Sequence, residues 1–337
     1  MISFENDYSE ICNKEILDAL AKCKDEQNAG YGLDKHSDNA AKLIKKACGH
    51  NDLDVHFIQG GTPCNVIAME LLKPYEAIIS VKSGHINVHE TGAVEHQGYK
   101  ILQAKDKEGK LIPESIDGIM AAHTDEHCVK PKLVFIANAT EYGTSYTKQE
   151  LKAIRNKCNK YNLYLYIDGA RIGNALLASG LTFKDIADVA DLFYIGGTKN
   201  GLMLGEAFCI KNKELKKDFR YIIKQNCSML AKGFTCGIMF ETLFKNDLYF
   251  KNAKHANLMA DKLRKAFTSK GIKFLYKTKT NQIFVILTNS QFNSLKKNFI
   301  FSKWSKYDQN HIVARFVTSW ATKEENVDAF IKKLSSL

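Results

Sequence analysis

Three short segments of the sequence combine residue types that could bind an anion or an amine. In the first, FIQGGTPCNVIAMELL (57–72), an apolar run that predicts a strand ends at two glycines, and a helix is expected to begin with Pro63 at its first position. The free N–H groups and the dipole of such a helix end favour an anion, Gly61 lets the backbone approach it closely, and the Thr62 hydroxyl can add a hydrogen bond. Taken alone, however, the segment is better explained as an ordinary strand–helix turn.

The second segment, LYLYIDGARIGNALLASG (163–180), places Asp168 at the end of a buried strand, with Arg171 shortly after it. Carboxylates are seldom buried without a partner. In an open α/β sheet ligands bind at the carboxyl ends of the strands, so Asp168 could face a cationic ligand atom and Arg171 a carboxylate or phosphate. On this segment alone, an Asp that caps the next helix beside an exposed Arg explains the pattern equally well.

The third segment, LFYIGGTKNG (192–201), carries Thr198 and Lys199 out of another strand end among glycines. A lysine in such a loop is usually solvated, and the loop also resembles a phosphate cradle. Lys199 nevertheless follows Asp168 by one strand–helix–strand unit, which predicts that both lie at the same edge of the sheet. An acid for a ring nitrogen, a lysine for a Schiff base and a helix end for a phosphate are the three parts that pyridoxal phosphate (PLP) requires.

Alternating strands and helices are predicted to position these residues. The alternation favours a mostly parallel, buried sheet with helices on both faces. One intervening helix, at 147–161, is supported by a capping box of Thr147 and Glu150. The apolar runs that predict strands are 55–58, 77–81, 133–137, 163–167, 192–195 and 207–210.

The pattern changes beyond about residue 245. A long amphipathic helix at about 249–270 is followed by short strands, and Thr322 and Glu325 are expected to open a final helix. We therefore expect a large domain over residues 1–245, including the N-terminal segment, and a smaller α+β domain over 246–337. The short strands are predicted at 274–276, 282–287 and 312–317.

The composition fits a globular chain of one large domain or two. Of the 337 residues, 45% are hydrophobic and 25% are charged. No apolar run approaches the ~18 residues that span a bilayer, and the first ten residues lack a basic start followed by an apolar core, so neither membrane insertion nor secretion is expected. The net charge of +11 is spread along the chain without a block of five like charges, which is more typical of a solvated Lys-rich surface than of nucleic-acid binding.

The nine cysteines are odd in number and never form a CxxC pair. This pattern predicts reduced core thiols in a cytoplasmic protein, with neither a disulfide framework nor a metal site.

Taken together, these segments resemble the PLP-dependent threonine aldolase and β-eliminating lyase family, which has the aspartate-aminotransferase-like fold (fold type I). The resemblance runs nearly from end to end, and IDGAR (167–171) with GGTKNG (196–201) at this spacing is its most specific part. The subgroup resembled is the low-specificity aldolase type, which cleaves L-threonine, L-allo-threonine and related β-hydroxy amino acids to glycine and an aldehyde. The other matching segments are FENDYSE (4–10), YGLD (31–34), GGTPCN (60–65), GHINVHETGAVE (84–95), ATEYGTSYT (139–147) and RFVTSW (315–320).

The resemblance implies a role for each candidate residue in the cofactor site. Lys199 matches the lysine that binds PLP covalently, and Asp168 matches the acid held against the pyridine nitrogen. Gly61 and Thr62 match the phosphate-binding pair. His85 matches the histidine that stacks on the cofactor ring, although a lone histidine is more often structural. Thr198, beside the lysine, is also expected to contact the cofactor.

Three further residues are implied to bind the carboxylate of the substrate or the cofactor. Arg171 and Arg315 match family arginines with this role, since a planar guanidinium suits a carboxylate. For Arg315 the alternative is a strand residue whose head reaches solvent. Asn6 stands where family members commonly have a serine that contacts the carboxylate.

The sequence departs from the family pattern at two positions. Phe234 replaces an arginine that often reaches the phosphate in the neighbouring subunit, and Lys232 could partly supply the lost charge. A second histidine found near Asn138 in some aldolases is also missing, with Thr140 in the comparable place. The base for the β-hydroxyl would then be His85, a bound water or the cofactor phosphate.

The sequence thus predicts a cytoplasmic PLP-dependent aldolase for a small amino-acid substrate, with no nucleic-acid, membrane or metal partner. The resemblance implies a homodimer or homotetramer with active sites at the subunit interface. One alternative keeps the cofactor and changes the reaction to that of another β-eliminating lyase, a racemase or an aminotransferase. A different class is a basic binding protein whose GGT and GGTKNG loops hold nucleotide or nucleic-acid phosphate.

Overall fold

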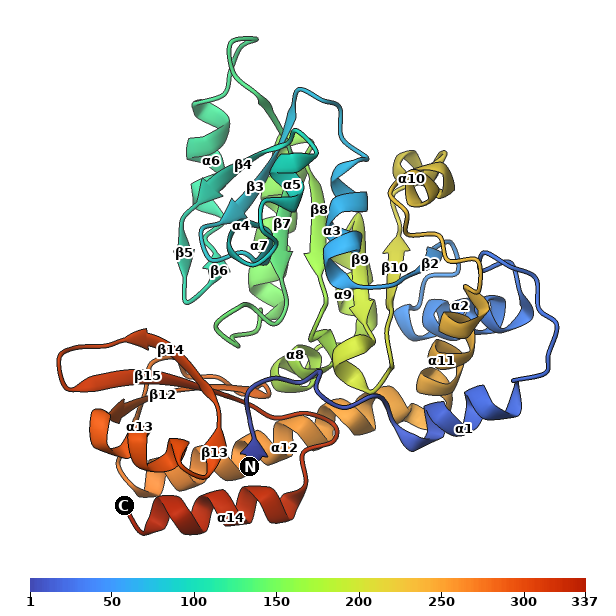
Figure 1. Ribbon diagram of the computed structural model, residues 1–337. Helices are drawn as coiled ribbons and strands as arrows, with labels where there is room; N and C mark the ends of the chain where they lie inside the picture. Colours follow the sequence, from blue (N-terminus) through green and yellow to red (C-terminus); the bar gives the residue numbers. More distant parts are fainter.

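The computed structural model describes all 337 residues, and its centre is a seven-stranded, mostly parallel sheet (Figure 1). The strand order is β2-β10-β9-β8-β7-β3-β4, and only β10 runs against its neighbours. The predicted sheet is therefore confirmed. Its strands are β2 (Asp54–Ile58), β3 (Glu76–Val81), β4 (Lys100–Ala104), β7 (Lys130–Ala137), β8 (Tyr164–Asp168), β9 (Leu192–Gly196) and β10 (Glu206–Ile210).

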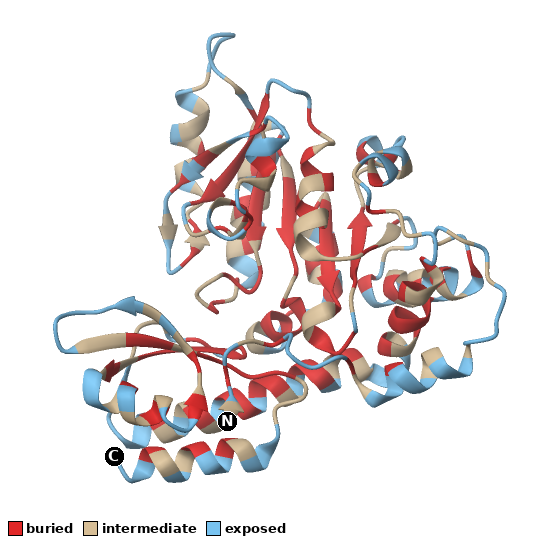
Figure 2. Cartoon of the chain, viewed as in Figure 1, coloured by how far each residue is buried: buried red, intermediate tan, exposed pale blue.

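Helices cover both faces of this sheet because the side chains of its strands alternate between two apolar cores. In β3, Ile79 belongs to one core cluster and Ile78 to the other. Figure 2 shows the central strands as almost continuously buried. The helices of this part are α1 (Lys14–Lys22), α2 (Lys35–Cys48), α3 (Gly61–Met69), α4 (His85–Val88), α5 (Ala93–His96), α6 (Glu114–Ala121), α7 (Lys148–Tyr161), α8 (Ile172–Ser179), α9 (Phe183–Val189), α10 (Phe219–Gln225) and α11 (Phe234–Phe244).

A second, four-stranded antiparallel sheet forms from the C-terminal third of the chain. Its order is β11-β12-β15-β14, and it packs with three helices around a separate core cluster (Figure 1). The elements are α12 (Leu248–Ser269), β11 (Lys273–Phe274), β12 (Gln282–Thr288), α13 (Asn289–Lys296), β13 (Phe299–Ile300), β14 (Ser302–Lys306), β15 (His311–Val317) and α14 (Glu324–Ser335).

The N-terminus of the chain packs with this C-terminal part. β1 (Ile2–Ser3) pairs in parallel with β13, and Phe4 is fully buried in the C-terminal core cluster. The division into domains at residues 245 and 246 stays a prediction.

Two helix starts differ from the sequence prediction. Helix α3 begins at Gly61 with Gly60 as its N-cap, so Pro63 is not its first residue. Helix α14 begins at Glu324, because the Thr322 hydroxyl accepts the N–H of Ser319 at 2.7 Å and does not cap the helix. The capping box of Thr147 and Glu150 at the start of α7 is confirmed.

None of the helices combines the length and the apolar character that crossing a bilayer requires.

Candidate active site

Two strand ends meet so closely that glycine is required at both. A Cβ atom at Gly169, just after β8, would lie 1.8 Å from the carbonyl oxygen of Tyr194, and one at Gly196 would lie 2.4 Å from that of Ala170. Since β8 ends at Asp168 and the 3₁₀ turn η1 (Thr198–Asn200) follows β9, this contact brings Asp168 and Lys199 to the same edge of the sheet.

Asp168 is buried and is held only by neutral hydrogen-bond donors. Its Oδ1 accepts the hydroxyl of Tyr194 at 2.5 Å and the N–H of Ala170 at 3.0 Å, and its Oδ2 accepts the amide of Asn65 at 3.3 Å. The hydroxyl of Tyr166 fixes the Asn65 amide by donating to its oxygen at 2.8 Å. A buried carboxylate with no cation beside it is well suited to a positively charged ligand atom.

His85 begins α4 and is tied to a buried carboxylate. Its Nδ1 lies 2.8 Å from Oε1 of Glu90, which also accepts Asn65 at 2.7 Å and Thr62 at 3.4 Å. Burial lowers the pKa of His85, but the hydrogen bond to Glu90 and nearby carboxylates outweigh it, so the pKa is raised above its usual value. Asn65 therefore links Asp168 to the Glu90–His85 pair in one chain of contacts.

Lys199 makes no hydrogen bond or ion pair within the chain, and its Nζ lies 5.9 Å from the centre of the Tyr8 ring. Burial and the charge of Arg171 lower its pKa, although Asp7 and other carboxylates oppose the shift. A lowered pKa increases the neutral fraction of the amine, which is the nucleophilic form.

The turn that carries Lys199 is fixed from behind by β10. Oε2 of Glu206 accepts the N–H of Gly197 at 2.7 Å, and the hydroxyl of Thr198 accepts the N–H of Gly205 at 3.0 Å. Burial raises the pKa of Glu206 to about 7. The sequence prediction missed Glu206, because the strand pattern gives no sign that a glutamate there is buried.

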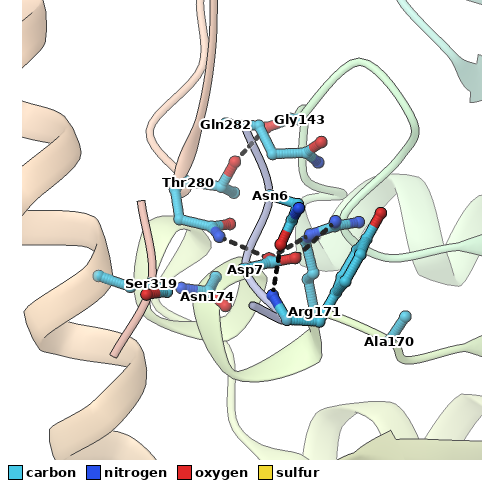
Figure 3. Close-up of polar contacts among 12 residues, drawn as sticks. Asn6, Asp7, Gly143, Ala170, Arg171, Asn174, Thr280, Gln282 and Ser319 are labelled. Carbon is cyan, nitrogen blue, oxygen red and sulfur yellow. Dashed lines mark hydrogen bonds and ion pairs between the residues drawn. The ribbon is translucent and has the colours of Figure 1, made fainter. Parts of the chain in front are cut away.

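Arg171 is paired inside the protein, which the sequence prediction did not anticipate. Its Nε and Nη2 donate to the carboxylate of Asp7 at 2.6 and 2.9 Å (Figure 3). Asn281 also donates to Asp7, at 2.9 Å. Burial would raise the pKa of Asp7, but Arg171 outweighs it and the pKa is lowered. The Nη1 atom of Arg171 has no partner within the chain, so only part of the guanidinium can meet a ligand.

Arg315 reaches the same region from β15. Its Nε and Nη2 donate to Oε1 of Gln282 at 3.2 and 2.6 Å, and its Cζ lies 5.6 Å from the centre of the Trp304 ring. Burial and the charge of Arg171 lower its pKa to about 10. Two neighbouring guanidinium groups repel each other, and an anionic carboxylate between them would relieve that repulsion.

Two candidate residues make no direct contact with this cluster. Oδ1 of Asn6 accepts the N–H of Tyr8 at 3.0 Å and the hydroxyl of Ser9 at 2.9 Å, so the amide shapes the turn that presents Asp7. Lys232 is exposed just before α11, and its ammonium group makes no hydrogen bond or ion pair in this chain.

The sheet, its reversed strand and the residues gathered at its edge define an α/β protein of the aspartate-aminotransferase-like fold. Among solved structures, an aspartate aminotransferase from Thermus thermophilus shares this fold with a TM-score of 0.69, at 13% identity over 100% of this chain and 91% of that chain.

The sequence model of the beta-eliminating lyase family matches residues 9–290, and the chain belongs to this family. It is 32% identical to a low-specificity L-threonine aldolase from a Pseudomonas species over 96% of this chain and 93% of that protein. It is also similar to a solved threonine aldolase from Leishmania major, with a TM-score of 0.98 and 43% identity over 100% of this chain and 99% of that chain. The family resemblance and the fold predicted from the sequence are therefore confirmed.

Proposed function

We propose that this chain is a PLP-dependent aldolase that cleaves L-threonine, L-allo-threonine and related β-hydroxy amino acids to glycine and an aldehyde. The observation that carries the proposal is the unpaired Lys199, with its lowered pKa, at the same sheet edge as the buried Asp168. The names of the Pseudomonas and Leishmania relatives support the choice of substrate.

The residues at this edge fit PLP. Lys199 would bind it covalently, Asp168 would accept the N–H of its ring, and His85 would stack on the ring. The buried carboxylate of Asp168, held by neutral donors alone, is the feature of this chain that suits a protonated ring nitrogen. When bound, PLP would supply an electron sink for the bond that breaks at Cα.

The phosphate of PLP would bind at the start of α3. Gly61 and Thr62 present free N–H groups at this helix end, and Gly61 has no room for a side chain because a Cβ atom there would lie 3.0 Å from the Tyr194 hydroxyl. Thr198 would contact the cofactor from the lysine turn. Phe234 stands in the place of the family arginine, and Lys232 would supply the missing positive charge. Lys232 is exposed in this chain, so its ammonium group can reach the phosphate site of a neighbouring subunit.

The substrate carboxylate would bind between Arg171 and Arg315, with Asn6 at its edge. The Nη1 atoms of both arginines have no partner within the chain, so each can donate to the carboxylate without losing its hold on Asp7 or Gln282. Fixing the carboxylate and the amine together orients the Cα–Cβ bond, which is a positioning task.

The assembly and location of the protein are part of the same proposal. We expect a cytoplasmic homodimer or homotetramer, with a large domain over 1–245 and a small domain over 246–337. One shallow cavity supports the expected subunit interface, because three of the side chains that line it are large, apolar and exposed. These are Tyr31, Leu33 and Tyr221, which contact with another subunit would bury.

A product assay tests the proposal. Purified protein supplied with PLP and L-threonine should release glycine and acetaldehyde in equal amounts. Release of ammonia and a keto acid would instead indicate β-elimination or transamination, and a colourless protein that binds no PLP and retains an oligonucleotide at low salt would indicate a phosphate-binding protein.

A further inference from the structure

We propose that His89 and Glu141 form the acid–base pair that acts on the β-hydroxyl group of the substrate, at the mouth of a cavity that receives the remainder of its side chain. This inference rests on the aldolase function proposed above and names residues for a step for which the sequence left His85, a bound water and the cofactor phosphate as alternatives. Both residues lie outside the set expected from the sequence.

Glu141 is a carboxylate that faces the candidate active site without a partner of its own. Its side chain is 14% exposed and accepts no hydrogen bond, and the only Lys, Arg or His side-chain nitrogen within 4 Å is Nε2 of His89, at 3.9 Å. Its charge nevertheless affects the pKa values of Lys199, Arg171 and His85, so it lies close to all three. An acidic group so placed can hold an imidazole in one orientation and stabilise its protonated form.

His89 lies one helical turn after His85, and their ring centres are 5.6 Å apart. Neither ring nitrogen of His89 forms a hydrogen bond, and the side chain is 45% exposed. His85 is less available as a base, because its Nδ1 is bound to Glu90 and its raised pKa favours the ring that already carries a proton on both nitrogens. His89 is therefore the imidazole near the site that is free to accept a proton.

The cavity beside this pair is lined in part by Trp304, the residue whose ring lies against Arg315. It has a volume of ≈ 490 Å³, and His89, Glu141, Tyr142 and Trp304 are among the residues that line it. The ring of Trp304 lies against the Arg315 guanidinium, and the ring of Tyr142 stacks on Tyr276 at 4.4 Å. A substrate whose carboxylate is bound by Arg315 can therefore direct its Cβ substituent into a space with rigid aromatic walls, which is much larger than the methyl group of threonine needs.

The proton and electron balance of the step needs no further reactant. His89 Nε2 accepts the β-hydroxyl proton, the oxygen electron pair forms the C=O bond of the aldehyde, and the Cα–Cβ bond breaks with its electron pair left on the Cα side. A proton added at Cα then gives glycine. The titratable groups in contact with His89 are His85 on α4 and Glu141 after β7, and Lys82 after β3 and Asp106 on β5 (Asp106–Lys107) line the same cavity.

The test compares His89→Asn with His96→Asn in the PLP-loaded protein. His96 is an exposed histidine on α5 without a side-chain partner, so its variant is the matched control. His89→Asn should lower kcat/KM for L-threonine by about 100-fold or more, as expected when a general base is lost. Added imidazole should restore part of the activity, because the cavity is open to solvent and the variant leaves room for a free imidazole.

Two readouts separate a role in proton transfer from a structural one. Glycine has no β-hydroxyl group, so its Kd, measured by cofactor absorbance, and the exchange of its Cα proton in D₂O should change less than about threefold in His89→Asn. Glu141→Gln keeps the His89 imidazole but removes the carboxylate beside it, and should lower kcat/KM for L-threonine by a smaller factor than His89→Asn while glycine exchange changes less than about threefold.

Unchanged cleavage by His89→Asn, or a parallel loss of glycine exchange, would overturn the inference. Failure of the aldolase function itself would look different, since the wild-type protein would then release no glycine from L-threonine.

Discussion

Asp168 and Lys199 have opposite electrostatic surroundings although they lie at the same sheet edge. The carboxylate is surrounded by neutral donors, whereas the amine lies near the charge of Arg171. An aromatic aldehyde cofactor with a protonated ring nitrogen requires a carboxylate beside that nitrogen and a partly neutral amine beside the aldehyde. Asp168 and Lys199 would provide these two groups. The assignment of the two residues can therefore be tested separately from the reaction.

The first prediction concerns Lys199. Lys199→Ala should abolish covalent attachment of PLP and nearly all turnover, because the amine that forms the bond is removed, while PLP can still bind without it. Mass spectrometry of the wild-type protein after borohydride reduction should place the adduct on Lys199. An adduct on Lys82 or Lys232 would contradict the assignment.

The second prediction concerns the pKa of His85. In wild-type protein this pKa should lie above the ordinary value of 6.5, because Glu90 and other carboxylates outweigh burial. In Glu90→Gln the pKa should fall, since burial is then opposed only by the carboxylates of Glu141 and Asp168, which are not hydrogen-bonded to the ring. NMR titration of the His85 ring measures both values, with exposed His96 as an internal control. An unchanged pKa in the variant would mean that the hydrogen bond at 2.8 Å is not formed in solution.

The sequence was sufficient to place Asp168 and Lys199 at one edge of the sheet, because each lies at or just after a recognisable strand end. It was not sufficient for Asn65, Glu90 or Asp7. In the sequence each of these three appears only as a polar residue in a mixed segment. Their contacts, such as that between Asp7 and Arg171, join distant parts of the chain, and no local pattern predicts them. The only usable signal was that Asn65 interrupts an apolar helix and has to be satisfied when buried.

At the level of elements, the site depends on how closely β8 and β9 approach each other. The strands themselves were predictable because buried parallel strands appear as short apolar runs. The edge strand β4 was missed, since its sequence KILQA offers only two adjacent large apolar residues between a lysine and a glutamine. The start of α3 was placed too late because Pro63 can occupy more than one position in the first turn.

The third prediction tests the close contact between the ends of β8 and β9. Gly169→Ala should lower the free energy of unfolding by about 3 kcal/mol or more, because the new Cβ atom would meet a backbone oxygen of β9 that cannot move independently. Gly118→Ala is the control, since Gly118 lies within α6 and a Cβ atom there meets nothing within 4 Å. This control should stabilise by about 0.5–1 kcal/mol. Urea unfolding measures both, and a similar result for the two variants would contradict the packing described.

Across the whole molecule, the first residues of the chain hold the two sheets together. Asp7 contacts Arg171 at the start of α8 (Figure 3). Phe4 packs in the C-terminal core, and Asp7 also contacts Asn281 just before β12. This arrangement could not be predicted from the sequence, because β1 has only two residues and its partner β13 lies near the other end of the chain.

The fourth prediction concerns this buried ion pair. Asp7→Asn should lower the free energy of unfolding by about 3–5 kcal/mol, because it leaves the Arg171 charge buried without its partner. Asp25→Asn, at an exposed position, should change the stability by less than about 0.5 kcal/mol. Urea unfolding at a fixed protein concentration measures both. Equal stability of the two variants would show that Arg171 does not depend on Asp7.

The central claim is that Arg171 and Arg315 hold the carboxylate while Lys199 marks the position of the amine, so that only one configuration at Cα aligns the Cα–Cβ bond for cleavage. The β-hydroxyl group meets fewer fixed groups, and a misplaced hydrogen bond there costs only about 1–3 kcal/mol, which gives a preference between diastereomers and not an exclusion. The most direct test is to measure kcat/KM for all four stereoisomers of threonine with the PLP-loaded protein. We predict that L-threonine and L-allo-threonine are both cleaved to glycine and acetaldehyde and that both D-enantiomers are refused. Cleavage of D-threonine at a rate near that of L-threonine, or complete refusal of either L-diastereomer, would contradict this account of the site.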